Sequence, residues 1–227
     1  SIIENPAFIS QTKDALTTKS AKFGSKYEVS EKFMKKLYKT NLINQVMDLA
    51  RFKETASLKR TDGKKVQSLR GIPKLDDANK AGTKHSNKCS LILTEGDSAK
   101  AFAMAGLSIV GRSLYGVFPL KGKLLNVREA SPKQLLDNEE IKNLKQIIGL
   151  QHNKDYSDKE NFSKLRYGRI VILTDQDVDG SHIKGLLFNF FHYFWPSLMK
   201  KKGYLTSMST PIVKAFKGNK TETFYNL

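Results

Sequence analysis

The chain has 227 residues, a length that suits one domain with extensions or two small domains. Its formal net charge is +17, from 39 Lys and Arg against 22 Asp and Glu. The single cysteine, Cys89, excludes an internal disulfide framework and favours a reducing compartment, and the most apolar stretch, residues 186–195, is well short of the roughly 20 residues of a membrane-spanning helix. The short apolar stretch favours a soluble protein with no membrane partner. The positive charge favours a polyanionic partner such as nucleic acid, although a lysine-rich surface without such a partner has the same composition.

The first 88 residues contain little that predicts a compact domain. Residues 1–29 are polar and too short to form one alone. At Ser30 a helical pattern begins, because apolar residues then recur mostly at steps of three and four as far as Leu49. Residues 59–88 are basic and rich in turn signals, and they predict a linker or irregular arm.

From Cys89 onward, short apolar runs alternate with helical patterns. Buried strands are predicted at residues 90–94, 115–120 and 170–174, with later strands near 204–205 and 211–213. Helices are predicted over residues 98–110, from Ser131 onward, over about 138–148, and over about 181–197. Strands that alternate with helices predict an α/β fold, in which helices cover both faces of a parallel sheet.

Four acidic residues directly follow two of these strands. Glu95 follows the strand at 90–94, while Asp175, Asp177 and Asp179 follow the strand at 170–174. Ligands bind beyond the carboxyl ends of parallel strands, so adjacent strands would bring these carboxylates together at one edge. A divalent cation would relieve their repulsion, and Mg²⁺ prefers such oxygen ligands. The pattern therefore predicts a magnesium site suited to phosphoryl transfer.

Small residues beside the acids fit this geometry. Glycines are expected to allow sharp backbone turns after the acids, and serines are expected to cap the helices that follow. These residues are Gly96, Gly180, Ser98 and Ser181. The two helix N-termini would then face a bound phosphate, which His182 and Lys184 are also placed to meet.

Three other interpretations of the sequence Asp-x-Asp-x-Asp-Gly stay open. An EF-hand calcium loop begins in the same way, but Leu186 stands where its glutamate would be. The acids could also be helix caps at the surface with no metal. A phosphoacceptor site like that of a response regulator is the third possibility, and it would leave Glu95 without a role.

A basic loop follows the strand at 115–120. Two lysines, Lys121 and Lys123, flank a glycine, and Asn126 and Arg128 lie close behind them. Such side chains would position a DNA backbone without reading its base sequence.

Three motifs give the chain a family resemblance. They are Glu-Gly-Asp-Ser-Ala from Glu95, Pro-Leu-Lys-Gly-Lys-Leu-Leu-Asn-Val from Pro119, and Thr-Asp-Gln-Asp-Val-Asp-Gly-Ser-His-Ile from Thr174. In this order they resemble the TOPRIM domain of type IIA DNA topoisomerases, which is a Rossmann-like fold. Gln176 and residues 72–79 are similar to eukaryotic topoisomerase II rather than to bacterial gyrase. The resemblance covers essentially the whole chain.

The resemblance implies roles for individual residues. Glu95, Asp175 and Asp177 would be the Mg²⁺ ligands, and Asp179 would complete the catalytic acids. The residues implied or placed to contact DNA are Lys123, Asn126, Lys121, His182 and Lys184. At Lys121 the family usually has arginine, so the charge is kept but the fork geometry is lost.

Near the N-terminus, Gln11, Thr12 and Lys13 resemble the transducer loop of the family. In that loop a lysine reaches the terminal phosphate of ATP, which is bound by the preceding ATPase domain. The resemblance thus implies ATP as a second cofactor, held mainly by residues that this chain lacks. An ordinary polar turn is the alternative for these three residues.

The resemblance also implies a domain division and an activity. Residues 1–29 would end the ATPase and transducer region, 30–88 would form a linker helix and basic arm, 89–206 the TOPRIM domain, and 207–227 the start of the DNA-cleavage region. The whole protein would be a nuclear, homodimeric, ATP-hydrolysing isomerase that cuts one double-stranded DNA, passes another through it and reseals the cut. The DNA-attacking tyrosine and the ATP pocket would lie outside this chain, which alone is expected to be inactive.

Two other functions stay open. A non-catalytic DNA-binding or regulatory module can have the same fold, because one fold hosts many functions. A primase or nuclease of the same metal-binding superfamily would leave residues 11–13 without a role.

Overall fold

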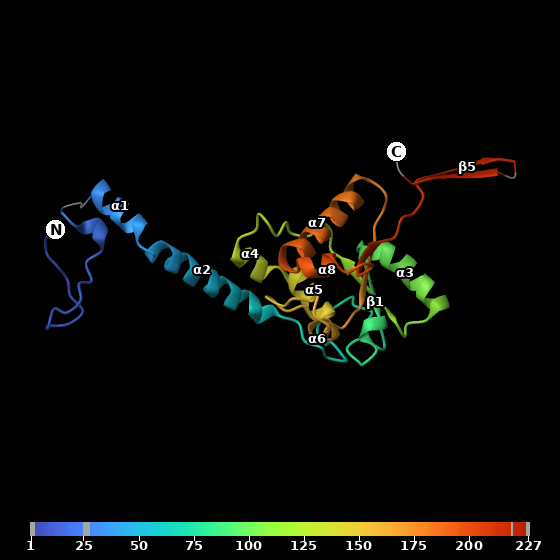
Figure 1. Ribbon diagram of the computed structural model, residues 1–227, viewed down its shortest axis with the longest axis horizontal. Coiled ribbons are helices and arrows are strands. Elements are labelled where there is room, and N and C mark those ends of the chain that lie inside the picture. The colour runs from blue at the N-terminus through green and yellow to red at the C-terminus, as the bar shows by residue number, and fades with distance from the viewer. Residues whose placement is uncertain (1–2, 25–27, 219, 226–227) are drawn as a thin grey trace. The chain divides into compact units, whose positions relative to one another are not determined.

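The computed structural model describes residues 3–24, 28–218 and 220–225 (Figure 1). The chain divides into two compact units, Ser1–Phe52 and Lys53–Leu227. The first unit contains a short 3-10 helix, η1 (Ser20–Lys22), then α1 (Glu31–Lys39) and the beginning of α2 (Leu42–Leu58). Ser30 caps α1 by accepting a hydrogen bond from the Phe33 backbone N–H, so the helix begins where the sequence predicts.

The single helical pattern predicted from Ser30 is two helices. The backbone becomes extended at Thr40, and the Thr40 hydroxyl donates to the Leu37 carbonyl at 2.7 Å. A side chain that bonds the backbone in this way competes with the helical hydrogen bonds and favours an end to the helix.

The second unit contains a four-stranded parallel sheet in the order β2-β1-β3-β4. Its strands are β1 (Ser90–Glu95), β2 (Tyr115–Leu120), β3 (Arg169–Leu173) and β4 (Leu205–Ser207). Adjacent strands β1 and β3 place Thr94 opposite Leu173, so their carboxyl ends meet at one edge. The predicted α/β fold with a parallel sheet is confirmed.

Helices cover both faces of this sheet (Figure 1). On one face lies α3 (Gly96–Val110), and the helices of the other face and its edges are α4 (Pro132–Asp137), α5 (Glu139–Ile148), α6 (Lys159–Ser163), α7 (Val178–Phe194) and α8 (Pro196–Met199). Side chains alternate along β1: Leu91 and Leu93 are fully buried in the core that includes α5 and α7, while Ile92 packs on the α3 side. Alternation of this kind is what a sheet covered on both faces requires.

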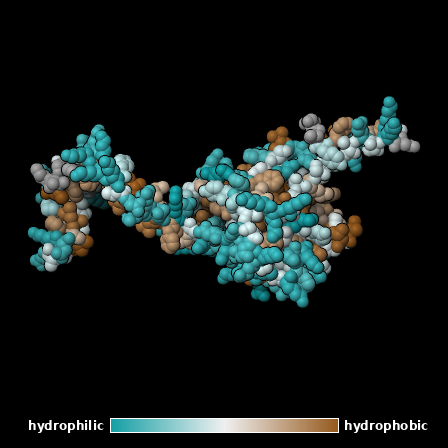
Figure 2. Space-filling model, viewed as in Figure 1, coloured by the Kyte–Doolittle hydropathy of each residue, from teal (hydrophilic) through white to brown (hydrophobic). Residues whose placement is uncertain are grey.

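The α3 side is covered less completely. An apolar groove of about 580 Å³ runs beside α3, between helix residues such as Phe102 and Ile109 and strand residues such as Val171. Ile109 is 87% exposed. Figure 2 shows hydrophobic surface where Figure 1 places the end of α3.

The predicted arm, residues 59–88, has little regular structure beyond η2 (Lys59–Thr61) and η3 (Ser86–Lys88), yet it packs into the second unit. Ala78 and Ala81 are buried in the same core as the sheet. Because these small residues are buried, the segment is part of the core of the second unit and is held more tightly than a linker would be.

Two buried cations hold the arm in place. The fully buried Arg166 donates to the Val66 and Ile147 carbonyls, each at 2.7 Å, and pairs with Asp77. Tyr167 also donates to Asp77 through its hydroxyl. The arm therefore bonds to residues about a hundred positions further along the chain.

The second cation is Lys145, which is 1% exposed. Its ammonium donates to the Leu58 carbonyl at 2.8 Å and to the Thr61 hydroxyl at 2.6 Å, and it lies 3.1 Å from Asp62. Burial lowers the pKa of Lys145, and the hydrogen bond and charge of Asp62 oppose that change. Asp62 also accepts from His152, so one carboxylate joins the start of the arm to two distant segments.

Beyond the sheet, β5 (Val213–Lys217) and β6 (Lys220–Phe224) pair as a separate antiparallel sheet. Of the strand predicted at 211–213, only Val213 lies in a strand, as the first residue of β5. None of the helices in the described part of the chain has the length and apolar character that spanning a bilayer requires.

Candidate active site

The four predicted acids lie at the carboxyl edge of the sheet. Glu95 is the last residue of β1, and Asp175 comes two residues after β3. Asp177 immediately precedes α7, and Asp179 lies in the first turn of that helix. Because β1 and β3 are adjacent and parallel, their ends bring Glu95 to the three aspartates.

Glu95 is the acid whose surroundings differ most from water. Its Oε2 atom is buried and has no hydrogen-bond partner among the described residues. Burial raises the pKa of Glu95 above its ordinary value of 4.5, the charges of Asp177, Asp175 and Asp179 raise it further, and a hydrogen bond from the Asp175 backbone opposes the rise. A buried carboxylate oxygen without a partner is costly, so this arrangement fits a cation bound at Glu95.

Asp177 caps α7, which corrects the prediction that Ser181 does so. Its Oδ1 atom accepts a hydrogen bond of 2.7 Å from the Gly180 backbone N–H, and α7 begins at Val178. The acid itself is thus the stronger helix-start signal, since aspartate is among the best capping residues. Its second oxygen takes no part in the cap.

Gly180 is required for a reason other than the predicted turn. It lies inside α7, and a Cβ atom there would come within 2.1 Å of the Asp175 carbonyl oxygen. The loop of acids folds back onto the first turn of the helix, and only a residue without a side chain allows that approach.

The start of α3 gives one confirmed prediction and one wrong one. Gly96 has φ of +75°, so the sharp turn after Glu95 does depend on glycine. Ser98 lies inside the helix, which begins at Gly96, and no side chain caps it. The predicted cap at Ser98 is therefore wrong.

The basic loop reaches the acids through Lys123. Its ammonium lies 2.9 Å from Asp179 Oδ1. The hydrogen bond and charge of Lys123 hold the pKa of Asp179 below its ordinary value. Acidic and basic features that are far apart in the sequence thus form one surface.

Lys121 is directed elsewhere. Its backbone N–H donates to the Glu140 carboxylate, and its ammonium lies 3.6 Å from Glu139. Both partners are in the first turn of α5, where Glu139 is exposed and Glu140 is half-buried. Lys121 is therefore paired with the N-terminal turn of that helix.

Asn126 is held by α7. Its side-chain oxygen accepts from Asn189 at 2.9 Å and from the Arg128 backbone N–H at 3.3 Å. Arg128 in turn donates to Asn189 and lies 3.0 Å from His192 Nδ1. No sequence signal marks Asn189 and His192 as site residues, because their connection to the loop exists only in three dimensions.

Lys184 and His182 lie in the first two turns of α7. Lys184 donates to the Gln176 side chain at 2.8 Å, and Gln176 donates to Ser209 at 2.8 Å. His182 is close enough to Asp179 for its charge to lower the pKa of that carboxylate, after the larger effects of Lys123. Both residues therefore stand beside the acids.

The acids are near one another without forming a closed cage. Among the described residues, no three Asp, Glu, His or Cys side chains surround a common point as metal ligands. Asp177 is engaged with the helix cap and Asp179 with Lys123. Assembly of the three predicted ligands around one ion would require side-chain rotation at this edge.

Residues 11–13 lie in a closed loop of the first unit. An antiparallel bridge joins Phe8 and Leu16, and the Thr12 hydroxyl donates to Asp14. The backbone of Lys13 is left-handed, with φ of +61°, and its ammonium lies 5.9 Å from the centre of the Phe8 ring. ATP binding by these residues stays a prediction.

Two family models match this chain. The model of the Toprim domain matches residues 90–209, which include all four acids and the basic loop, and that of DNA gyrase B matches residues 1–66. The first covers more than half of the chain.

Relatives match over the whole chain. DNA topoisomerase 2 of Pisum sativum is 58% identical over all of this chain, and DNA topoisomerase 2-beta of Homo sapiens is 53% identical over all of it. DNA topoisomerase 2 of Acanthamoeba polyphaga mimivirus is 57% identical over 95% of it. The chain spans only 14% to 17% of the length of these relatives.

A solved structure is also similar. The DNA-binding, cleavage and re-ligation domain of Plasmodium falciparum topoisomerase II superimposes with a TM-score of 0.66 and is 60% identical, over 71% of this chain and 22% of that one. Sequence, fold and the arrangement of acids agree with one another. The chain belongs to the Toprim domain family and is homologous along its length to eukaryotic-type DNA topoisomerase 2.

Proposed function

We propose that this chain is the metal-binding part of a type IIA DNA topoisomerase, which uses Mg²⁺ to cut and reseal double-stranded DNA during ATP-dependent strand passage. One observation carries the proposal: a buried Glu95 oxygen, with no hydrogen-bond partner in the described part of the chain, lies at the sheet edge where three aspartates gather. The identity to DNA topoisomerase 2 along the whole chain supports the same function.

Glu95, Asp175 and Asp177 would hold Mg²⁺, with Asp179 beside them as the fourth catalytic acid. The ion, when bound, would stabilise charge on the oxygens of the phosphate that is transferred. The chain fixes the place: β1 and β3 hold the carboxylates, and the N-terminus of α7 favours a phosphate there. The free oxygen of Asp177 is available for a metal while its Oδ1 atom caps α7.

The basic loop and α7 would bind the DNA backbone next to these acids. Lys123 and Asn126 are the central contacts in this proposal, with Lys121, His182 and Lys184 around them. The hydrogen bonds from Asn189 to Asn126 and from Arg128 to Asn189 support a loop whose side chains are set before DNA arrives. Preset contacts of this kind position DNA and do not select its sequence.

The remaining residues would connect this site to the rest of a longer protein. Residues 1–29 would end an ATPase and transducer region, 30–88 would be a linker helix and arm, 89–206 the TOPRIM domain, and 207–227 the start of the cleavage region. The nucleophilic tyrosine and the ATP pocket would lie in other parts of that protein. It would act as a homodimer in the nucleus.

The test is magnesium-dependent cleavage of duplex DNA by the longer protein, with Glu95 intact and with Glu95→Gln. Cleavage should be lost in the variant while DNA binding stays. A non-catalytic module would show no magnesium-dependent cleavage in either form, and that outcome would exclude the proposal.

DNA binding by the 227-residue chain should be weak, independent of base sequence and strongly dependent on salt. Each phosphate neutralised by Lys or Arg releases counterions, so the logarithm of the affinity falls with the logarithm of salt by about 0.9 per contact. Titration of a labelled duplex at several salt concentrations measures this slope. A flat salt dependence, or a strong preference for one sequence, would contradict the predicted backbone binding.

Lys13→Ala in the longer protein should slow ATP hydrolysis and leave nucleotide-free, magnesium-dependent DNA cleavage nearly unchanged. The reason is that Lys13 lies in the first unit, whereas the acids lie in the second. Steady-state ATP turnover and cleavage are measured on the same preparation, with Lys19→Ala as a matched exposed lysine. Equal loss of both activities would mean that Lys13 has no separate ATP role.

A further inference from the structure

A basic pocket lies at the amino edge of the sheet, opposite the acids. This hollow of about 320 Å³ is lined by cations that come just before or at the start of strands β1, β3 and β4. The cations are Lys88, Arg169, Lys201 and Lys202. Arg169 lies opposite Ser90 in the strand register, so the parallel arrangement itself brings these segments together.

No acid balances this pocket. Its lining contains no Asp or Glu, and none of its four cations pairs with a carboxylate within the described residues. The lysine-rich hollow beside α1 is different, because it includes Glu31, which lies 3.9 Å from Lys35. Unpaired cations that converge on one hollow concentrate positive potential there.

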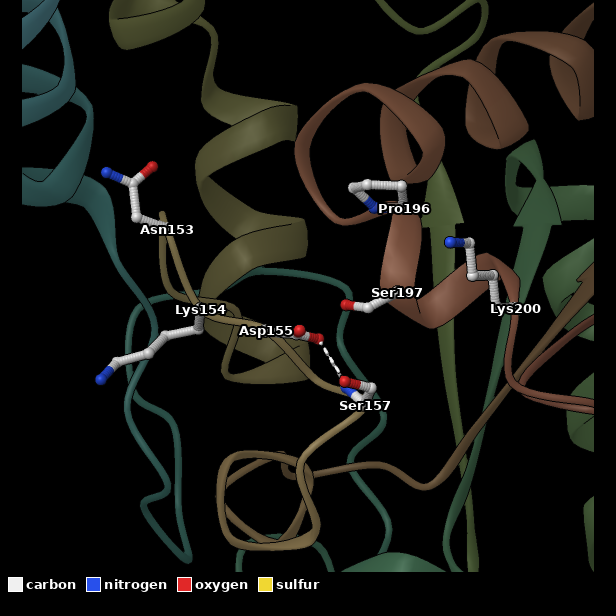
Figure 3. Close-up of a pocket in the computed structure, with 7 residues that line it drawn as sticks. All are labelled: Asn153, Lys154, Asp155, Ser157, Pro196, Ser197 and Lys200. Carbon is white, nitrogen blue, oxygen red and sulfur yellow. Dashed lines mark hydrogen bonds between the residues drawn. The ribbon is translucent and has the colours of Figure 1, made fainter.

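The three lysines that follow α8 divide between a hollow that contains an acid and the basic pocket, whose lining contains none. Lys200 lines a neighbouring hollow of about 410 Å³ that contains Asp155 (Figure 3). Hydrogen bonds from Ser157 lower the pKa of Asp155, and the charge of Lys200 lowers it further. Lys201 and Lys202 instead line the pocket that has no acid.

Part of the basic pocket is fixed in position. The Lys201 ammonium lies 3.5 Å from the centre of the Phe162 ring, and this cation–π contact restrains the side chain. Lys88, Arg169 and Lys202 are exposed, so they can reach a ligand without leaving other partners. The arrangement suits an extended polyanion that contacts several cations at once.

We propose that this amino-edge pocket binds the phosphate backbone of a DNA segment other than the segment at the acids. The proposal rests on the proposed function for the identity of the polyanion. Strand β1 has six residues and so spans about 17–20 Å, which separates the two edges of the sheet. A segment seated at Glu95 therefore leaves this pocket free for a second one.

The test compares the wild-type chain with a double variant, Arg169→Gln with Lys202→Gln. Both residues are exposed, and the variant keeps the partly buried Lys201. The slope of log affinity against log salt for duplex DNA should be smaller in the variant by about two, one unit per lost phosphate contact. A matched control, Lys53→Gln with Lys133→Gln, removes two exposed lysines that do not line the pocket, and its slope should equal that of the wild type.

A second measurement addresses the second segment directly. The chain is bound to an immobilised duplex, and capture of a free labelled duplex is followed. The pocket variant should stay on the immobilised DNA and lose most of the capture, whereas the control variant should capture normally. Circular dichroism of each variant shows that the fold is retained.

The outcomes separate the two proposals. If the wild-type chain fails to bind DNA, the amino-edge site is excluded, and the proposed function is decided separately by magnesium-dependent cleavage in the longer protein. If it binds DNA but the pocket variant matches the control in slope and capture, only the amino-edge site is excluded. If the pocket variant binds DNA as the wild type does but no longer binds a polyglutamate peptide, the pocket is assigned to an acidic protein partner and the DNA assignment is overturned.

Discussion

Glu95→Gln is expected to abolish magnesium-dependent DNA cleavage by the longer protein while it stabilises the metal-free chain. Cleavage should fall about 100-fold or more, since even the residues that support metal ligands are worth roughly 10- to 100-fold. In chelator the variant loses the repulsion that Glu95 feels from three aspartates, so it should gain up to about 1 kcal/mol, the scale of a partly exposed charge pair.

Magnesium should reverse the order of stability. At 100 times its dissociation constant, a ligand that binds only the folded state stabilises it by about 2.7 kcal/mol, and the wild-type chain should gain this amount. The Gln variant should gain little. Thermal melting of both chains, in chelator and in magnesium, measures the reversal, and Glu222→Gln, at an exposed position on β6, is the matched control.

The pH dependence of stability should identify the same carboxylate. Folding raises the pKa of Glu95 above 4.5, so just above that pH the folded chain binds more protons than the unfolded chain. Wild-type stability in chelator should therefore fall as pH rises through this window, and the Gln variant should lack that step. If the variant melts below wild type in chelator and both respond equally to magnesium, Glu95 is a structural residue and the metal site is excluded.

Glu95 is a sharper test position than Asp177. Asparagine at 177 would still cap α7, because Asn and Asp cap helices about equally well. The change would nevertheless remove charge at the helix N-terminus, where a negative charge is favourable. A stability change at Asp177 would thus combine helix and metal effects, whereas Glu95 makes no side-chain cap.

Asp77→Ala is expected to destabilise the chain by about 3–5 kcal/mol, since it leaves the buried Arg166 without its carboxylate. Loss of that size is a large part of the stability of a typical domain. Asp77→Asn should cost less, because its side-chain oxygen can still accept from Arg166 or Tyr167. Urea unfolding of the chain measures these differences.

An exposed ion pair provides the control for Asp77. Glu160 lies 2.6 Å from Lys164 one helical turn away, and both side chains are largely exposed. Glu160→Ala should cost only about 0.3–0.5 kcal/mol. If Asp77→Ala costs no more than Glu160→Ala, the buried pair does not hold the arm to the second unit.

The sequence predicts the sheet and the meeting of the acids, because both follow from local signals. Short apolar runs mark β1, β2 and β3, and acids directly after two of them must lie at one edge once those strands are adjacent. The helix predicted over about 138–148 likewise agrees with α5, which ends at Ile148 before a left-handed Gly149. These features depend on residues close together in the chain.

Features that depend on distant residues are not predicted. In the sequence the turn-rich arm resembles a linker. In the structure the arm is held by Arg166, which donates to the carbonyl of Val66, 100 positions away. Ser98 and Ser181 resemble caps, but the helices begin before them, where the chain leaves the strands. The pairing of Lys121 with α5 requires knowledge of which helix starts beside the basic loop.

The buried cations also determine the smallest piece of this chain that can fold. Family membership is recognised over residues 90–209, yet a polypeptide cut to that segment would retain Arg166 and Lys145 and lose Asp77 and Asp62. Two interior charges would then lack their counterions and several of their hydrogen-bond acceptors, which is strongly destabilising. We therefore expect the autonomous folding unit to extend upstream to about Leu58, so that a homology boundary and a thermodynamic boundary differ by some thirty residues here.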